Sequence, residues 1–228
     1  MRSVLVIGSG DHGQVVADIL LAAHQQGAEE VPIGFLDDRE GLVGTQVLGL
    51  PVLGTIADLS RLPCDGAIIA IGDNATRRRL FLALQGQGIP WVSAIHPRAT
   101  VAPNVKLGRG VMICPGAVVE TGSVIGDGAI LNTNCVVGHH SRVGEFAHIC
   151  ACSVVGGHGQ IGEGALIGIG SVIIPRHVVG DWAVVAVRSA ATRDVPSRTM
   201  AMGMPARVMQ WLGQNERPGS SGLGGIGR

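Results

Sequence analysis

From residue 95 onward the sequence repeats every six residues, and this period limits the fold more than any other feature of the chain. Sixteen consecutive blocks, from IHPRAT at 95–100 to VAVRSA at 185–190, each begin with Ile, Val or Leu, and most carry a small residue at the fifth position. One aliphatic and one small inward position per six residues is the signature of a parallel β-helix, in which three hexapeptides form one triangular coil. The blocks therefore predict a left-handed parallel β-helix of about five coils. Glycine often follows the aliphatic residue, and we expect it to allow positive φ at the corners.

The first 93 residues follow a different pattern, in which apolar runs alternate with amphipathic stretches. This alternation predicts a small parallel α/β sheet of the Rossmann-like type. The predicted strands are 3–7, 31–36, 48–53, 66–71 and 91–94, and the predicted helices are 12–26 and 75–87, with a helical turn at 56–60. The predicted domains are an α/β domain at 1–93, the β-helix at 94–190, a C-terminal segment at 191–212 and a Gly/Ser-rich disordered tail at 213–228.

Composition excludes several classes of partner. The 17 basic and 17 acidic residues cancel, so the chain lacks the positive charge expected of a nucleic-acid-binding protein. No apolar stretch reaches the roughly 18 residues of a membrane span, and no basic leader precedes the first apolar run. The five cysteines lack CxxC spacing, and Cys150-x-Cys152 is not a usual zinc spacing, so we predict reduced cysteines and no metal site. These features predict a cytoplasmic protein.

The stretch IGSGDHGQVV at 7–16 matches the dinucleotide fingerprint, because Gly8, Gly10 and Gly13 follow an apolar run and open a predicted helix. Such a turn points a helix N-terminus at a phosphate. A nicotinamide oxidoreductase is one interpretation, and Asp37 after the second strand would suit a ribose hydroxyl. The 93 residues are too few for the two βαβαβ halves of the full dinucleotide fold, however, and no second catalytic domain follows. A nucleotide sugar fits the same turn.

The blocks VGHHSR and VGEFAH carry His139, His140 and His148, which are the candidates for acid–base chemistry. A neutral imidazole can take the proton from an amine or hydroxyl that attacks a thioester. His139 occupies the third position of its block, so we expect it to project outward, towards a neighbouring subunit. Neighbouring residues on a strand-like path alternate faces, so we expect His139 and His140 to point in opposite directions.

Several motifs together resemble one family. GSGDHGQVV, GFLDD, AIGDNATRR, IHPRATV and LNTNCVVGHHSRVGEFAHI occur in this order in sugar acetyltransferases of the sialic-acid and bacillosamine type, and GMPARVM at 203–209 resembles a segment near the end of hexapeptide acyltransferases. The resemblance spans residues 1 to about 209. It implies a nucleotide-sugar domain joined to a left-handed β-helix, acetyl-CoA as co-substrate, and a homotrimer with active sites between subunits.

The resemblance also implies roles for single residues. His139 matches the general base of a direct acetyl transfer, and His148 matches a histidine that contacts acetyl-CoA near its thioester. The family usually has Glu or Asp directly after the base, where this chain has His140. Either His140 orients His139 less effectively, or another acid such as Glu145 substitutes. Further matches are Gly157, Ile169 and Val187 for the cofactor, Gly10, Asp11 and His12 for the nucleotide sugar, Asp37 and Asp38 for the surroundings of the nucleobase, and Gly72 for a backbone contact.

Three functions follow from these observations. The first is an acetyl-CoA-dependent N-acetyltransferase that acts on a nucleotide-linked amino sugar for surface-glycan synthesis, with UDP favoured over GDP by the resemblance. The second is an O-acetyltransferase of sialic acid or a related nonulosonate, although a free sugar acid would not need a nucleotide-binding domain. The third is a non-catalytic β-helix that binds nucleotide sugars, which His140 in place of an acid supports. Asp11 has no explanation at this stage, because its carboxylate would repel a sugar phosphate.

Overall fold

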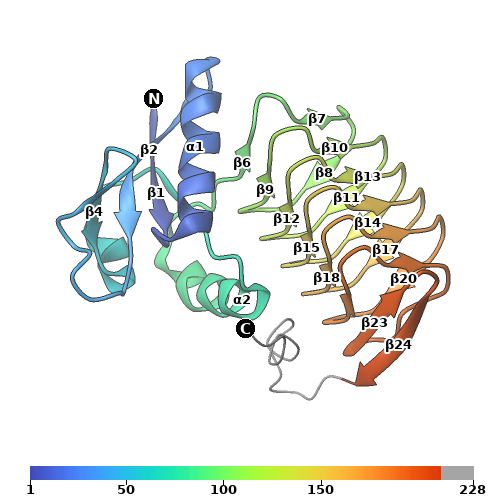
Figure 1. The fold of residues 1–228 in the computed structure, drawn as a ribbon. Helices are drawn as coiled ribbons and strands as arrows, with labels where there is room; N and C mark the ends of the chain where they lie inside the picture. The colour runs from blue at the N-terminus through green and yellow to red at the C-terminus, as the bar shows by residue number, and fades with distance from the viewer. Residues whose placement is uncertain (212–228) are drawn as a thin grey trace, which may run out of the picture.

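The computed structural model describes residues 1–211, in which an α/β domain packs beside a three-sided β-helix (Figure 1). The predicted tail at 213–228 lies outside the described residues. None of the helices described is long and apolar enough to cross a membrane.

The N-terminal domain is a five-stranded sheet with the order β3-β4-β2-β1-β5, in which all neighbours are parallel except β3 and β4. The strands alternate their side chains between two layers. Val4 and Val6 of β1 pack on α1, whereas Leu5 and Ile7 pack on the side of α2. The strands are β1 (Arg2–Ile7), β2 (Glu30–Leu36), β3 (Gln46–Val47), β4 (Leu50–Gly54) and β5 (Gly66–Ile69); the helices are α1 (Asp11–Gln25), α2 (Asn74–Leu84) and the short 3-10 helices η1 (Ile56–Arg61) and η2 (Gln85–Gln87).

Two of the predicted strands differ from the structure. The run predicted at 48–53 covers most of β4 and the turn before it, because the positive-φ residues Leu48 and Gly49 form a hairpin that joins β4 to the preceding strand β3. The strand predicted at 91–94 reduces to a single bridge between Trp91 and Ala67, because the chain there leaves the α/β sheet and enters the β-helix at Ala94.

The β-helix consists of three parallel sheets of two-residue strands, each strand paired with the strands 18 residues before and after it, so the predicted fold class is confirmed. The first sheet contains β6 (Ala94–Ile95), β9 (Met112–Ile113), β12 (Ile130–Leu131), β15 (His148–Ile149), β18 (Leu166–Ile167) and β21 (Val184–Val185), and ends in the hairpin of β23 (Thr199–Gly203) and β24 (Ala206–Trp211). The second contains β7 (Thr100–Val101), β10 (Val118–Val119), β13 (Val136–Val137), β16 (Val154–Val155), β19 (Val172–Ile173) and β22 (Ala190–Ala191); the third contains β8 (Lys106–Leu107), β11 (Val124–Ile125), β14 (Arg142–Val143), β17 (Gln160–Ile161) and β20 (Val178–Val179).

The first and fifth positions of the hexapeptides point inward, as the period predicts. From Ile113 to Val185 every first-position side chain is buried in one continuous core. Buried serines at the fifth position are also satisfied, because their hydroxyls donate to the backbone. The Ser153 hydroxyl, for example, donates to the Gly168 carbonyl at 2.8 Å, and that of Ser171 donates to Ala186 at 2.7 Å.

The glycines at the second position serve close packing of the coils, and the expectation that they adopt positive φ was wrong. A Cβ on Gly126 would lie 2.5 Å from the Glu145 amide nitrogen, and one on Gly144 would lie 2.6 Å from that of Glu163. Positive φ falls instead at the fourth position, which holds Gly in some coils and His140 (φ 57°) or His158 (φ 60°) in others. The next coil, rather than the local backbone, therefore selects glycine at position two.

Arg77 of α2 joins the two domains. It is 1% exposed, and its guanidinium donates to the carbonyl oxygens of Gly128 and Phe146 on the β-helix, both at 2.7 Å. It also donates to the Ile71 carbonyl at 2.8 Å and to Asn74 Oδ1 at 2.8 Å. These bonds fix α2 on the first sheet, beside which it lies in Figure 1.

Candidate functional site

One cleft of about 590 Å³ lies at the carboxyl ends of β1, β2 and β5. Strand β1 pairs with β2 on one side and with β5 on the other, so the cleft opens where the strand order reverses, which is the usual binding position in an open α/β sheet. All the residues matched to substrate binding by the resemblance line it: Gly10, Asp11, His12, Asp37, Asp38 and Gly72.

In the turn at the edge of the cleft, Gly8 and Gly13 are each required to be glycine, for different physical reasons. Gly8 has φ of +100°, and a Cβ on Gly13 would lie 2.0 Å from the Gly8 carbonyl oxygen. Gly8 thus permits the turn, and Gly13 lets α1 start directly against β1. Helix α1 begins at Asp11 after Gly10, so its N-terminus faces the cleft and can bind an anion.

The carboxylates of Asp37 and Asp38 are already hydrogen-bonded within the chain. Asp37 is buried, and its Oδ2 accepts from the amide and the hydroxyl of Ser9, both at 2.8 Å. The guanidinium of Arg39 binds both Asp37 oxygens, at 3.0 and 2.9 Å, and is the main reason that the pKa of Asp37 lies well below its usual range. Asp38 Oδ1 accepts from the Ile56 amide at 2.9 Å. Contact of this acidic pair with a nucleobase stays a prediction.

Two arginines that the sequence reasoning missed line the same cleft, Arg39 and Arg79. The Arg39 side chain is 61% exposed although Asp37 holds it, so its remaining surface faces solvent and any ligand. The hydrogen bond and the charge of Asp37 raise the pKa of Arg39, and the charge of Asp11 adds a smaller effect in the same direction. The negative charge of Asp11 is therefore stabilised within the chain, because it lies in the first turn of α1 and interacts with the positive Arg39. The sequence DDR at 37–39 could have indicated Arg39.

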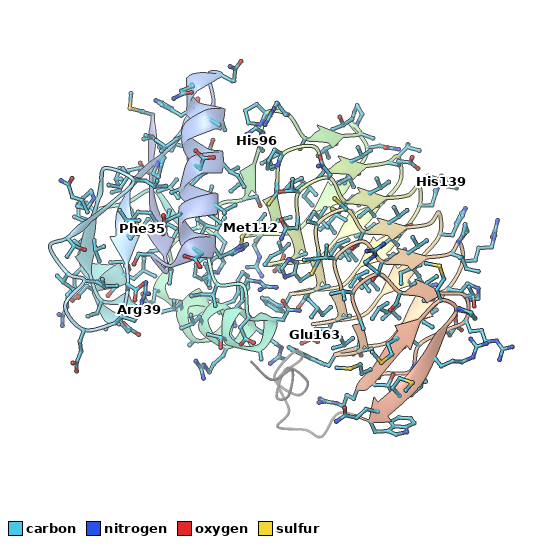
Figure 2. The ribbon with its side chains drawn as sticks, viewed as in Figure 1. Phe35, Arg39, His96, Met112, His139 and Glu163 are labelled. Carbon is cyan, nitrogen blue, oxygen red and sulfur yellow. The ribbon has the colours of Figure 1, made fainter. Side chains whose placement is uncertain are left out.

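His12 and His148 meet at the boundary between the domains. Their ring centroids are 6.4 Å apart; His12 Nε2 lies 3.1 Å from the sulfur of Met112, and His148 Nε2 lies 3.2 Å from Asn132 Nδ2. Figure 2 places Met112 between the two domains. Burial, with a smaller effect from the positive Arg77, lowers the pKa of His12 to about 4 and that of His148 to about 3. Both rings are therefore neutral at pH 7. Contact of His148 with acetyl-CoA stays a prediction.

We expect these two histidines to make the protein acid-labile. Their pKa values in the folded state lie below the unfolded value of 6.5, so the unfolded state binds more protons as the pH falls below 6.5. The free energy of unfolding should fall between pH 6.5 and about 4, by up to about 1.4 kcal/mol per pH unit for each histidine. Urea unfolding at pH 7.5, 6 and 5 measures this slope. A His148→Gln variant should show a flatter slope, and an unchanged slope would contradict the assignment.

His139 lies at the corner between β13 and β14, on the exposed surface. Its amide donates to Glu120 Oε2 at 2.8 Å, and its Nδ1 lies 3.2 Å from Nδ1 of His140. The expectation that the two rings point in opposite directions was wrong, because His140 has φ of 57° and the chain turns there instead of continuing as a strand. The Glu120 carboxylate, which sequence reasoning did not consider, accepts from the backbone amide of His139 and not from its ring. A role for Glu145 in orienting the ring stays a prediction.

The residues matched to the cofactor lie in three places. Gly157 lies beside His139, since a Cβ on it would be 2.5 Å from His139 Nε2. Ile169 and Val187 are exposed and lie one coil apart at the corner between the first and second sheets. His148 lies in β15 of the first sheet, near the cleft. One chain thus brings Gly157 to His139 and pairs Ile169 with Val187, but it does not gather the whole set.

The cleft of the α/β domain and the corner that carries His139 and His140 (the histidine corner) do not lie next to each other in one chain. Figure 2 shows Arg39 and His139 at opposite sides of the molecule, with the β-helix between His139 and the α/β domain. The fold and these two sites define a class of protein, the hexapeptide β-helix proteins that carry an N-terminal α/β domain with a nucleotide-type cleft.

Comparison with known proteins narrows this class to one family. Residues 3–84 match the model of the PglD N-terminal domain. The chain is 34% identical to the perosamine N-acetyltransferase of Caulobacter crescentus, solved with CoA and GDP-perosamine, with a TM-score of 0.85 over 92% of this chain and 98% of that one. It is also 34% identical to the acetyltransferase domain of PglB from Neisseria gonorrhoeae, solved with acetyl coenzyme A, with a TM-score of 0.84 over 91% of this chain and 99% of that one.

A curated relative is the UDP-N-acetylbacillosamine N-acetyltransferase of Bacillus subtilis, which is 30% identical over 115 residues. The matched segment covers 50% of this chain and 51% of the Bacillus protein. The chain belongs to the PglD-like family of sugar N-acetyltransferases.

Proposed function

We propose that this protein transfers the acetyl group of acetyl-CoA to the amino group of a nucleotide-linked sugar. The observation that carries the proposal is the cleft at the strand-order reversal, where the N-terminus of α1 and the exposed Arg39 can bind phosphates. The domain around this cleft is too small for the two halves of a full dinucleotide fold, which favours a nucleotide sugar over a nicotinamide dinucleotide. Relatives of the same architecture, solved with CoA and GDP-perosamine or with acetyl-CoA, support the two ligand classes.

In this proposal His139 is the general base. As the sugar amine attacks the thioester carbon, a C–N bond forms, the C–S bond to CoA breaks, and the imidazole takes the proton of the amine. Nδ1 of His139 faces His140, which leaves Nε2 to take the proton, and the absence of a side chain on Gly157 lets the ring lie against the next coil. Glu120 holds the backbone of His139 through its amide. No acyl-enzyme is formed, so the cysteines have no part in the reaction.

We also propose a homotrimer in which the site is completed by a neighbouring copy. The separation of Arg39 from His139 in one chain supports this arrangement, because the cleft of one subunit would then face the histidine corner of the next. The proposed cofactor contacts support the trimer as well, because Gly157 lies at one corner of the β-helix and Ile169 and Val187 lie at another. A neighbouring subunit could bring the two sets together around one cofactor. The domain boundaries predicted from the sequence are retained in this proposal.

Arg39 gives a prediction for substrate binding. Replacing Arg39 by Ala removes a cation from the cleft, and a hydrogen bond to a charged group contributes about 1.5–3 kcal/mol. We expect KM for the nucleotide sugar to rise about 10- to 100-fold, with KM for acetyl-CoA and kcat little changed. Steady-state kinetics with each substrate varied in turn measure the effect. Arg61→Ala, which removes an exposed cation of η1, is the matched control, and an equal KM in both variants would remove Arg39 from the site.

The experiment that tests the function is a screen for thiol release from acetyl-CoA. The substrates are UDP- and GDP-linked amino sugars, with free sialic acid as the comparison. We expect turnover on a nucleotide-linked amino sugar, with UDP favoured as the nucleotide. Turnover on sialic acid alone would favour the O-acetyltransferase, and nucleotide-sugar binding without turnover would favour a non-catalytic β-helix.

A further inference from the structure

Three histidine side chains converge at the corner that carries His139. His139, His140 and His158 each bring a ring nitrogen within 4.8 Å of the others. Among residues 1–211 no other group of three or more His, Cys, Asp or Glu side chains comes together in this way. The proposed acetyl transfer uses His139 and its contact with His140, and it leaves His158 without a role.

The stacking of the coils builds this cluster. His140 and His158 both occupy the fourth position of their hexapeptides, and their φ values of 57° and 60° point both rings the same way. The rings stack with an interplanar angle of 10° and centroids 5.2 Å apart. Gly157 occupies the third position of the next coil, so the His139 ring can lie against it and meet His158 edge to face, with centroids 5.2 Å apart. The His158 amide also donates to the His139 carbonyl at 2.8 Å.

The spacing of the His139 and His140 nitrogens suits a metal ion. Nδ1 of His139 and Nδ1 of His140 are 3.2 Å apart. Two nitrogens bound to a tetrahedral Zn²⁺ at 2.0–2.1 Å are about 3.3 Å apart. Imidazole is a preferred ligand of Zn²⁺, Cu²⁺ and Ni²⁺, and it binds in its neutral form.

A cation and an anion lie on opposite sides of the cluster. Arg176 occupies the fourth position one coil beyond His158 and supplies a positive charge on that side. Glu120, whose carboxylate accepts from the His139 amide, supplies a negative charge on the other side. The cluster thus lies between a positive and a negative charge.

We propose that His139, His140 and His158 form a binding site for a divalent transition-metal ion of the Zn²⁺ class, with the fourth position open to solvent. An ion bound to Nδ1 of His139 would leave the hydrogen of the neutral ring on Nε2, which could then not accept the proton of the amine, so metal binding and acetyl transfer would exclude each other. This last consequence rests on the proposed function, whereas the site itself does not.

The test is the binding of Zn²⁺ to the full chain without an affinity tag, measured by titration calorimetry, with Co²⁺ absorption as the probe of tetrahedral nitrogen ligands. We expect one ion per chain. His158→Asn removes a ligand, and Asn accepts the positive φ, as Asn134 does at the equivalent position. Loss of second-shell partners already lowers metal affinity about 10- to 100-fold, so loss of a ligand should lower it by at least about 100-fold.

His24→Ala, which removes a histidine of α1 outside the cluster, is the matched control and should bind Zn²⁺ as the unmodified protein does. Absence of binding by the unmodified protein, or unchanged affinity in both His158→Asn and His140→Asn, would overturn the proposal. If Zn²⁺ binds through these residues and acetyl transfer continues at saturation, the metal site stands and the role of His139 as base falls.

Discussion

We expect His139→Ala to lower kcat for acetyl transfer by at least about 100-fold, the usual scale for loss of a general base. KM for the nucleotide sugar should change little, because the cleft proposed to bind its phosphates lies on the other side of the chain, around Arg39. The side chain is exposed, so the variant should unfold at the same temperature as the unmodified protein. Steady-state kinetics and thermal unfolding together separate a loss of chemistry from a loss of structure.

A second variant, His140→Glu, tests the residue that lies next to the proposed base. His140→Glu places a carboxylate where the family usually has one, so we expect activity to be retained or raised. A large loss in this variant would show that His140 has a role of its own. Unchanged kcat in His139→Ala would refute the assignment of the base, whatever the result at position 140.

The second large effect is on stability. We expect Arg77→Met to lower the free energy of unfolding by about 3 kcal/mol or more, because a buried group that loses its partner costs about 1–3 kcal/mol and several are lost together. The carbonyls of Gly128, Phe146 and Ile71 would all lose a donor. Denaturant unfolding measures the change. Arg79→Met on the exposed side of the same helix is the control, and an equal effect in both variants would contradict the role of Arg77 as the link between the domains.

The sequence alone predicts the β-helix well, because a six-residue period leaves few other ways to bury the aliphatic position of each block. The cleft residues Gly10, Asp37 and Gly72 were predicted from the family resemblance. The structure brings them together because each follows a strand, and parallel strands bring their carboxyl ends to one edge. The strand at 91–94 was not placed correctly, since its apolar residues serve two domains at once.

Contacts between coils were beyond sequence reasoning. His158 contacts His139 only because one coil of the β-helix takes 18 residues, and no local sequence motif predicts that contact. The second-position glycines were misread for the same reason, since the neighbour that excludes a Cβ at Gly126 is Glu145 in the next coil. The role of Arg77 in joining the domains was not predicted either, because its hydrogen-bond partners on the β-helix lie 51 and 69 residues away in the sequence.

The measurement that tests the central claim most directly is the identification of the acetylated product. The protein is incubated with acetyl-CoA labelled in the acetyl group and with the nucleotide-linked amino sugar that gives turnover. We predict one labelled acetyl group, attached to the sugar through an amide that survives mild alkali, with the nucleotide still in place. An alkali-labile ester, or label found only on a free sugar acid, would contradict the account.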